Sequence, residues 1–314
     1  MSIKCAFLFA GQGSQAMGMG EDFYNNSDKA KEMIEEASAR TGIDFKTLLF
    51  TENDDLAKTE FTQPAILLVS AIAHRLFIEA MDIKPIYALG HSLGEFSALV
   101  SVGGLNAIDA VELVNLRGKL MAKACEGQAV GMLVSLGLSD DVVEEICQTR
   151  RDAGDKVWAV NYNADGQIVI AGIKSDLEKL APILKEAKAK RAMLLNMSVA
   201  SHCPLLQSAV VPLEVKLHEM LRDNFIAPVI SNVTAEPYDT KRDGLLLLPK
   251  QLVAPVRYKQ SIARIDDEVD CYIEFGHGAT LKGLNRKATK KPHFVVSDMS
   301  TLQIAIDEIK KLEV

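Results

Sequence analysis

Short, continuous apolar runs alternate along the chain with longer stretches in which apolar side chains recur every three or four positions. Two of these runs, residues 4–10 and 85–90, lead directly into glycine-containing turns. Strands that are apolar at every position are typical of parallel sheets buried on both faces. Helical spacing is found at residues 27–41 and 62–80. This alternation predicts an α/β fold in which helices cover both faces of a parallel sheet.

The pattern changes near residue 127 to strand, helix, two strands joined by a turn, helix and strand. These segments are residues 129–138, 139–151, 157–163, 166–172, 175–190 and 191–197. The β-α-β-β-α-β order is the ferredoxin-like unit, so we expect residues 127–197 to form an inserted ferredoxin-like subdomain. The first pattern then returns, and the larger domain would comprise residues 1–126 and 198–314. Its later elements are predicted strands at 227–234 and 270–276 and a closing helix at 300–314.

Length, charge and cysteine spacing narrow the class of protein. A chain of 314 residues is long enough for a full core and a smaller second domain. No apolar run approaches the roughly 20 residues that span a bilayer, and the N-terminus is too weakly apolar for a signal peptide, so we expect a cytoplasmic protein with no membrane partner. A net charge of −7 argues against nucleic-acid binding by general phosphate attraction. The five scattered cysteines form no C-x-x-C pair, which favours reduced thiols over disulfides or a zinc site.

Residues 90–94, Gly-His-Ser-Leu-Gly, fit the G-x-S-x-G nucleophile elbow between a predicted strand and a predicted helix. The glycines on either side of Ser92 suit a turn so tight that a Cβ there would clash. The turn would aim the serine oxygen at the positive end of the following helix, where the Leu93 N–H is free to donate. A glycine-bracketed turn serine without a catalytic role is the alternative interpretation.

A serine hydroxyl needs a base, and the chain has six histidines. His74 and His218 fall within helical patterns, which favours structural roles. His91 adjoins the serine on a sharp turn, and we expect its side chain to point away from Ser92. His202 follows the return from the insert, in a predicted loop at the mouth of the larger sheet where catalytic groups concentrate. It is therefore the candidate base.

Arg117 lies on the apolar face of a predicted helix. Leu113, Val114, Leu120 and Met121 are three or four positions away, so the guanidinium should project toward the protein interior. Leaving it desolvated and unpaired would cost several kcal/mol. We therefore expect its positive charge to be balanced either by an internal carboxylate or by the anionic group of a bound ligand.

Several motifs in order along the chain, from about residue 7 to residue 284, together resemble the malonyl-CoA:acyl-carrier-protein transacylase family. The motifs are FAGQGSQ, GHSLGE, LRGKLM, NYNADGQIVIAG, SVASHCPLL, KQLVAPVRY and EFGHGATLKGL. The resemblance implies an α/β-hydrolase-like large domain with a parallel sheet and a ferredoxin-like insert. It also implies residue roles: Ser92 as nucleophile, His202 as base, Gln12 and the Leu93 amide around the acyl carbonyl, Arg117 for the malonyl carboxylate, and the Gln251 backbone carbonyl to orient the histidine.

The reaction implied by the resemblance is a ping-pong transfer of malonyl from malonyl-CoA, through a malonyl-serine, to the phosphopantetheine thiol of acyl carrier protein. This transfer supplies fatty-acid elongation, with the CoA thioester as substrate and no metal or redox cofactor. A buried arginine should reject acetyl-CoA by a factor of roughly 10⁴. Asn163 and His91 are further candidate site-lining residues, although asparagine is common in turns without any ligand.

Two basic clusters stand out against the acidic net charge. They are Lys185, Lys188, Lys190 and Arg191, and Arg286, Lys287, Lys290 and Lys291. Taken alone, each is typical of a solvated face. An acidic carrier protein would need a local basic patch on a chain of like sign, and we select Lys190 and Arg191 as the candidate docking residues.

Three other functions compete with acyl transfer. Gly11, Gly13 and Ala16, with Glu35 further on, loosely match a dinucleotide-binding fingerprint, but that function leaves the elbow without a purpose. A serine esterase would share the elbow yet have no use for an inward-facing Arg117. A catalytically idle carrier-binding scaffold would not be acylated. A branched malonyl extender is a further alternative for the substrate.

Overall fold

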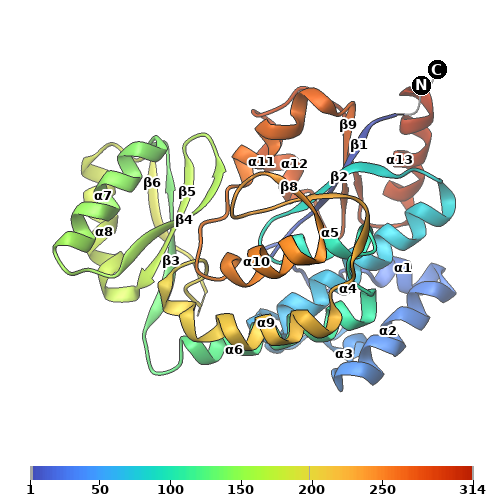
Figure 1. The fold of residues 1–314 in the computed structure, drawn as a ribbon, viewed down its shortest axis with the longest axis horizontal. Helices are drawn as coiled ribbons and strands as arrows, with labels where there is room; N and C mark the ends of the chain where they lie inside the picture. Colours follow the sequence, from blue (N-terminus) through green and yellow to red (C-terminus); the bar gives the residue numbers. More distant parts are fainter. Residues whose placement is uncertain (1–2, 198, 313–314) are drawn as a thin grey trace.

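The structure is a computed structural model that describes residues 3–197 and 199–312. Figure 1 shows two bodies, each built around its own sheet. The larger sheet contains β1 (Cys5–Phe9), β2 (Pro85–Gly90), β7 (Asn224–Ile230), β8 (Pro237–Thr240), β9 (Cys271–Phe275) and β10 (His293–Val296). The smaller sheet contains β3 (Val130–Leu136), β4 (Val157–Ala164), β5 (Gln167–Ile173) and β6 (Arg191–Leu194).

Helices surround both sheets. They are α1 (Glu21–Asn26), α2 (Asp28–Thr41), α3 (Phe45–Phe50), α4 (Thr59–Ala80), α5 (Gly94–Ser101), α6 (Ala107–Ala124), α7 (Asp140–Asp152), α8 (Lys174–Glu186), α9 (Gln207–Met220), α10 (Lys241–Gln251), α11 (Tyr258–Ile265), α12 (Thr280–Asn285) and α13 (Met299–Leu312). Short 3-10 helices are η1 (Asp55–Ala57), η2 (Pro204–Leu206) and η3 (Asp266–Glu268).

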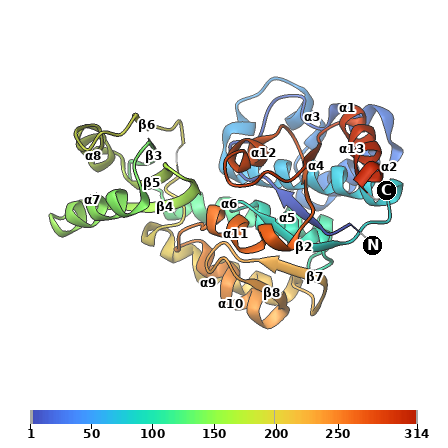
Figure 2. The ribbon, with the colours of Figure 1, turned by 90° about the horizontal axis from the view of Figure 1, so that it is seen from above.

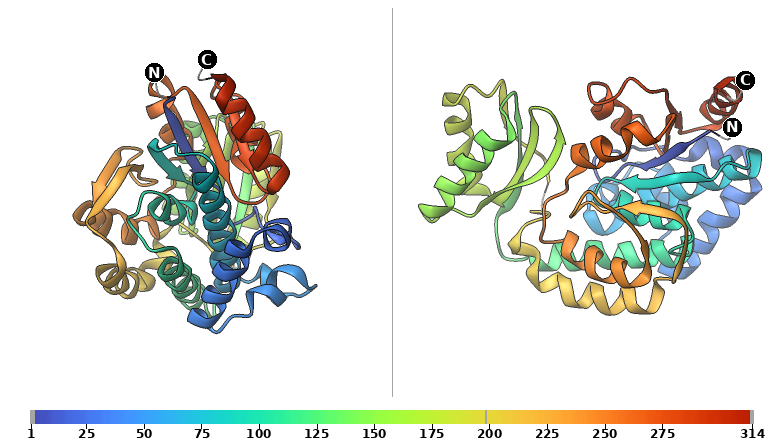
Figure 3. Two further views of the ribbon diagram at one scale, coloured as in Figure 1. Left: turned by 90° about the vertical axis from the view of Figure 1, so that its right-hand side faces the viewer. Right: turned by 45° about the horizontal axis from the view of Figure 1, so that its top comes forward.

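The larger sheet has the strand order β10-β9-β1-β2-β7-β8, with helices on both faces (Figure 3). Its neighbouring strands pair in parallel except for β7 and β8. Strand β1 is buried along its whole length because its two faces meet different cores. Phe7 contacts the ring of Phe77 on α4, whereas Leu8 belongs to a second cluster with Ile262 of α11. The predicted α/β class is confirmed.

The far edge of this sheet differs from the sequence-based expectation. The strand expected at 227–234 ends at Ile230. There the chain turns sharply, with Ser231 N donating to Glu236 O and Ala235 N to Ser231 O. It then returns as the antiparallel strand β8, which the apolar pattern does not predict because only one of its four residues is buried. Helices α10 and α11 were also not predicted.

The smaller sheet has the order β4-β5-β3-β6, with all neighbours antiparallel. This is the ferredoxin-like arrangement expected from the β-α-β-β-α-β pattern. Seen from above, this body lies to one side of the larger one (Figure 2). Its β4 edge is tied to the larger body at Val256, which donates from its N–H to Val160 O and accepts from Tyr162 N at 2.8 and 2.9 Å. The insert is therefore held by backbone hydrogen bonds as well as by its connections.

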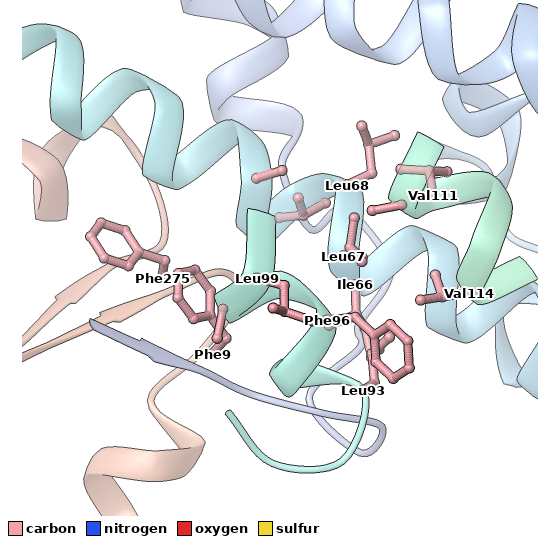
Figure 4. Close-up of a cluster of buried hydrophobic side chains, with 14 of the residues drawn as sticks. Phe9, Ile66, Leu67, Leu68, Leu93, Phe96, Leu99, Val111, Val114 and Phe275 are labelled. Carbon is pink, nitrogen blue, oxygen red and sulfur yellow. The ribbon is translucent and has the colours of Figure 1, made fainter. Parts of the chain in front are cut away.

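Helix α4 is long and apolar enough to cross a membrane, and it is the single such helix among those the structure describes. In the 18-residue window concerned, 83% is buried inside the protein. Ile66, Leu67 and Leu68 of this helix share the main core with Phe96 of α5 (Figure 4). Its hydrophobicity is thus accounted for by core packing, and this core supports the turn that carries Ser92.

Candidate active site

Ser92 lies in the turn between β2 and α5, with a backbone φ of 54°. A Cβ on Gly90 would lie 2.0 Å from the backbone of Gly94, and one on Gly94 would lie 2.0 Å from the carbonyl oxygen of Phe9. Real Cβ atoms do not approach other atoms so closely, so both positions require glycine. The turn therefore has the tight geometry of a nucleophile elbow.

Asn232, which follows the neighbouring strand β7, holds this turn. Its Oδ1 accepts from Ser92 N at 2.6 Å, and its Nδ2 donates to Gly90 O at 2.7 Å. One buried carboxamide thus supplies hydrogen-bond partners to two backbone groups of the tight turn, which would otherwise be buried without partners. The sequence pattern did not point to Asn232. Its signal was a polar residue just after a predicted apolar strand, since the carboxyl ends of adjacent parallel strands gather functional groups.

His202 lies beside the serine, also with a positive φ, of 62°. Its Nδ1 is 2.7 Å from the backbone oxygen of Gln251, and its Nε2 is 2.7 Å from Ser92 Oγ. A carbonyl can only accept, so Nδ1 carries the proton and Nε2 accepts from the serine hydroxyl. Burial, with a further contribution from the charge of Arg117, lowers the pKa of His202 to about 3. The imidazole is thus neutral at physiological pH and able to take a proton.

Arg117 points inward from α6 and is only 1% exposed. Its Nη1 donates to Gln63 at 2.6 Å, and its Nη2 donates to Gln251 Oε1 at 2.9 Å and to Ser92 Oγ at 3.2 Å. Within residues 3–197 and 199–312, no carboxylate lies at salt-bridge distance from it, and its Nε has no hydrogen-bond partner. Burial lowers the pKa of Arg117 to about 10, opposed by the charge of Glu95. The guanidinium is still a cation, and it is directed at the serine.

Two further donors lie at the ends of adjacent strands. Gln12 follows β1, and its Oε1 accepts a hydrogen bond from Thr59 at 2.9 Å. Its Nε2 is thereby left to donate to another group. Leu93 is the N-cap residue just before α5, and its N–H donates to no other group in the described part of the chain. Both residues follow a strand end next to Ser92. These positions suit donors to an acyl oxygen.

His91 and Asn163 contact each other rather than the serine. His91 Nε2 lies 2.7 Å from Asn163 Oδ1, and the His91 ring lies 5.7 Å from that of Tyr258. Burial lowers the pKa of His91 despite this hydrogen bond. The contact joins β4 of the insert to the elbow, in line with the structural role expected for His91.

The candidate docking residues lie away from this cluster. Lys190 and Arg191 are exposed, next to and at the start of the edge strand β6. Neither side chain forms an ion pair with any residue that the structure describes. Both charges are therefore open to a partner.

A buried acid near the serine was not predicted. Glu95 is 1% exposed on the first turn of α5, and it accepts hydrogen bonds from Gln251, Asn232 and Tyr238. Burial raises the pKa of Glu95 to about 7, against the opposing effect of these hydrogen bonds and of Arg117. The signal in the sequence was one charged residue in a helix that is otherwise apolar or small.

No cluster of three or more histidine, cysteine or acidic side chains suited to a metal occurs in the described ranges. The five cysteines all lie within these ranges, and all are buried.

Comparison with known proteins agrees with this arrangement. The model of the acyl transferase domain family matches residues 6–311. The malonyl CoA-acyl carrier protein transacylase of Bacillus subtilis is 36% identical over 311 residues, 98% of either chain. The crystal structure of malonyl-CoA:acyl carrier protein transacylase from Helicobacter pylori superposes with a TM-score of 0.95 at 43% identity, covering 98% of this chain and 99% of that one.

A second solved structure contains an acyl-carrier protein. It is a malonyl-transacylase in complex with its type II PKS acyl-carrier protein, with a TM-score of 0.93 and 34% identity, covering 97% of this chain and 99% of that one. The fold and the site define an acyl transferase. The chain belongs to the malonyl-CoA:acyl-carrier-protein transacylase family. The resemblance noted in the sequence is thus confirmed.

Proposed function

We propose that this chain transfers a malonyl group from malonyl-CoA to the phosphopantetheine thiol of an acyl carrier protein through a malonyl ester of Ser92. The observation that carries the proposal is a serine oxygen 2.7 Å from a neutral imidazole and 3.2 Å from a buried guanidinium. The first group activates a nucleophile. The second suits an acyl group that ends in a free carboxylate.

In the first half-reaction, His202 Nε2 takes the hydroxyl proton as Ser92 Oγ bonds to the thioester carbon. The Leu93 N–H and Gln12 Nε2 donate to the developing oxyanion, and each such donor is typically worth about 3 to 4 kcal/mol of barrier. The intermediate then collapses, the carbon–sulfur bond breaks, and His202 returns the proton to the CoA sulfur. Malonyl remains on Ser92, with its carboxylate against Arg117.

In the second half-reaction, the carrier's thiol gives its proton to His202 Nε2 while its sulfur attacks the malonyl-serine carbonyl. The serine oxygen leaves and recovers the proton from His202. The Gln251 backbone carbonyl stabilises the imidazolium in both halves by accepting from Nδ1, so no acid needs to contact the histidine. This is a ping-pong cycle.

The proposed reaction also implies a pathway, a protein partner and a cellular compartment. The product supplies fatty-acid elongation, and the complex of a related transacylase with its carrier protein supports an acyl carrier protein as partner. We place the reaction in the cytoplasm. Residues 1–126 and 198–314 form the catalytic domain in this proposal, and residues 127–197 form the insert, whose separate sheet supports the division.

The test is to incubate the protein with malonyl-CoA and measure its intact mass, with the Ser92→Ala protein as control. We expect one malonyl group on the wild type, localised to Ser92 by peptide mapping, and none on the variant. Adding holo acyl carrier protein should discharge the adduct onto the carrier. Release of free malonate instead would indicate an esterase, and absence of any label would indicate a non-catalytic scaffold; either result refutes the proposal.

A further inference from the structure

Glu95 is a buried carboxyl group that touches none of the reacting atoms. Its Oε2 accepts from Gln251 Nε2 at 2.7 Å and from Asn232 N at 3.1 Å, and its Oε1 accepts from Tyr238 at 3.0 Å. A buried acid is costly unless its position serves a purpose or its hydrogen bonds repay the cost. Three donors from separate segments of the chain converge on this carboxylate, so its buried charge is stabilised by several hydrogen bonds.

Gln251 is the residue through which Glu95 reaches the site. Its backbone oxygen accepts from His202, its side-chain oxygen accepts from Arg117, and its Nε2 donates to Glu95 and, at 3.1 Å, to Ser92 O. One residue therefore contacts the nucleophile's backbone, the base and the arginine. Any movement of its side chain would disturb the contacts with Arg117, Glu95 and the Ser92 backbone.

The amide of Gln251 lies between two opposite charges. Its carbonyl faces the Arg117 guanidinium, and its amino group faces the Glu95 carboxylate. A flipped amide would place its amino group against the guanidinium and its oxygen against the carboxylate, and both contacts would be repulsive. The negative charge of Glu95 therefore acts together with Arg117 and the Ser92 carbonyl to favour one of the two orientations that the amide could adopt.

We propose that Glu95 is a positioning residue for acyl transfer, which acts by holding the side-chain amide of Gln251 in the orientation that places Arg117 for the substrate carboxylate. The inference rests on the proposed function. It assigns to the acid an indirect part in the site, because Gln251 stands between it and the groups that would meet the substrate.

The pH dependence of the malonyl-transfer rate provides a test of this role of Glu95. The groups that face Glu95 are Arg117 of α6, Tyr238 of β8, Gln251 of α10 and Asn232 after β7, and His202 lies beyond Gln251. The raised pKa of Glu95, about 7, means that acidification below neutrality removes its charge. Malonyl transfer should then decline well above the pH at which His202 itself is protonated.

The experiment compares Glu95→Gln with Glu274→Gln. The first change keeps the shape but removes the charge. Glu274 is also 1% exposed and accepts from two backbone amides, Leu281 N and Lys282 N, outside the site. Rates of Ser92 acylation by malonyl-CoA and by acetyl-CoA are measured from pH 5 to 9, with melting temperature as a control for folding.

We expect Glu95→Gln to lower the malonyl rate by roughly 10- to 100-fold at pH 8, to lower the acetyl rate less, and to lack the decline near pH 7. Glu274→Gln should keep the wild-type profile. Tyr238→Phe tests the idea if Glu95→Gln does not fold, since losing this hydrogen bond raises the pKa of Glu95 and should move the decline upward by about 0.5 to 1 pH unit.

A wild-type rate and pH profile in Glu95→Gln, or an equal loss with both thioesters, overturns the positioning role. An unshifted decline in Tyr238→Phe overturns it as well. These results differ from failure of the proposed function, in which the wild type itself would form no malonyl-serine.

Discussion

Ser92 and His202 adopt positive φ angles of 54° and 62°, a backbone region that few residues other than glycine occupy. Such conformations cost roughly 1–3 kcal/mol each and persist only where the surroundings over-determine them. For Ser92 the surroundings are the carboxamide of Asn232 and the tight glycine contacts. For His202 they include its hydrogen bond to the Gln251 backbone. The strain directs both side chains at one point, which separate relaxed loops would not achieve.

In the proposed function, Arg117 would determine the preference for malonyl-CoA. We expect Arg117→Ala to remove most of the preference for malonyl-CoA over acetyl-CoA, a factor of roughly 10⁴, because the substrate carboxylate loses its partner. Acylation of Ser92 by acetyl-CoA should remain. Arg117→Lys should keep part of the preference, since a lysine retains the charge without the planar bidentate geometry. Competition between the two thioesters, read by mass, measures the ratio; an unchanged ratio in Arg117→Ala would rule out the clamp.

At the scale of elements, the elbow depends on how closely β2, α5 and β1 approach one another. Gly94 begins α5 where the end of β1 leaves no room for a side chain. The same closeness brings Leu93 and Gln12 to adjacent strand ends. The local pattern of glycines predicts the turn because the constraint is steric and acts within a few residues. This local pattern does not reveal Asn232, which follows β7 and contacts Ser92 from 140 positions away.

Gly94→Ala should therefore lower the free energy of unfolding by about 3 kcal/mol or more, or prevent folding, because the added methyl overlaps the Phe9 carbonyl oxygen. The matched control is Gly283→Ala in α12, where a Cβ meets nothing within 4 Å. That change should stabilise the protein by about 0.5 to 1 kcal/mol. Urea unfolding measures both. A Gly94→Ala protein as stable as the wild type would contradict the steric account.

At the scale of the whole molecule, the insert places a basic patch on an acidic protein. The net charge is −7, yet Lys190 and Arg191 are exposed on the insert. An acidic carrier protein would be repelled by most of the surface and attracted there. The insert is tied to the larger body through β4, at Val256, whereas Lys190 and Arg191 lie next to and at the start of β6, at the opposite edge of the same sheet. A carrier that binds them would therefore have to reach Ser92 with its phosphopantetheine arm.

Reversing both charges, with Lys190→Glu and Arg191→Glu together, should slow transfer from malonyl-Ser92 to the carrier by roughly tenfold or more at low salt. Acylation by malonyl-CoA should change little. Single-turnover kinetics of each half-reaction measure the two effects separately. The corresponding reversal of Arg286 and Lys287 is the control; an effect confined to that pair, or equal effects on both half-reactions, would show that the docking assignment is wrong.

The sequence by itself determined the features that depend on neighbours along the chain. Apolar runs and helical spacing predicted the α/β body and the ferredoxin-like insert, glycine spacing predicted the elbow, and helical periodicity turned Arg117 inward. Only the tertiary structure decided which groups meet. The serine and its histidine are 110 positions apart, and Gln251 contacts the serine across 159. Sequence periodicity carries no information about contacts between residues so far apart in the chain. The contacts of Glu95 and Asn232 and the antiparallel edge strand β8 were therefore recognised only in the folded structure.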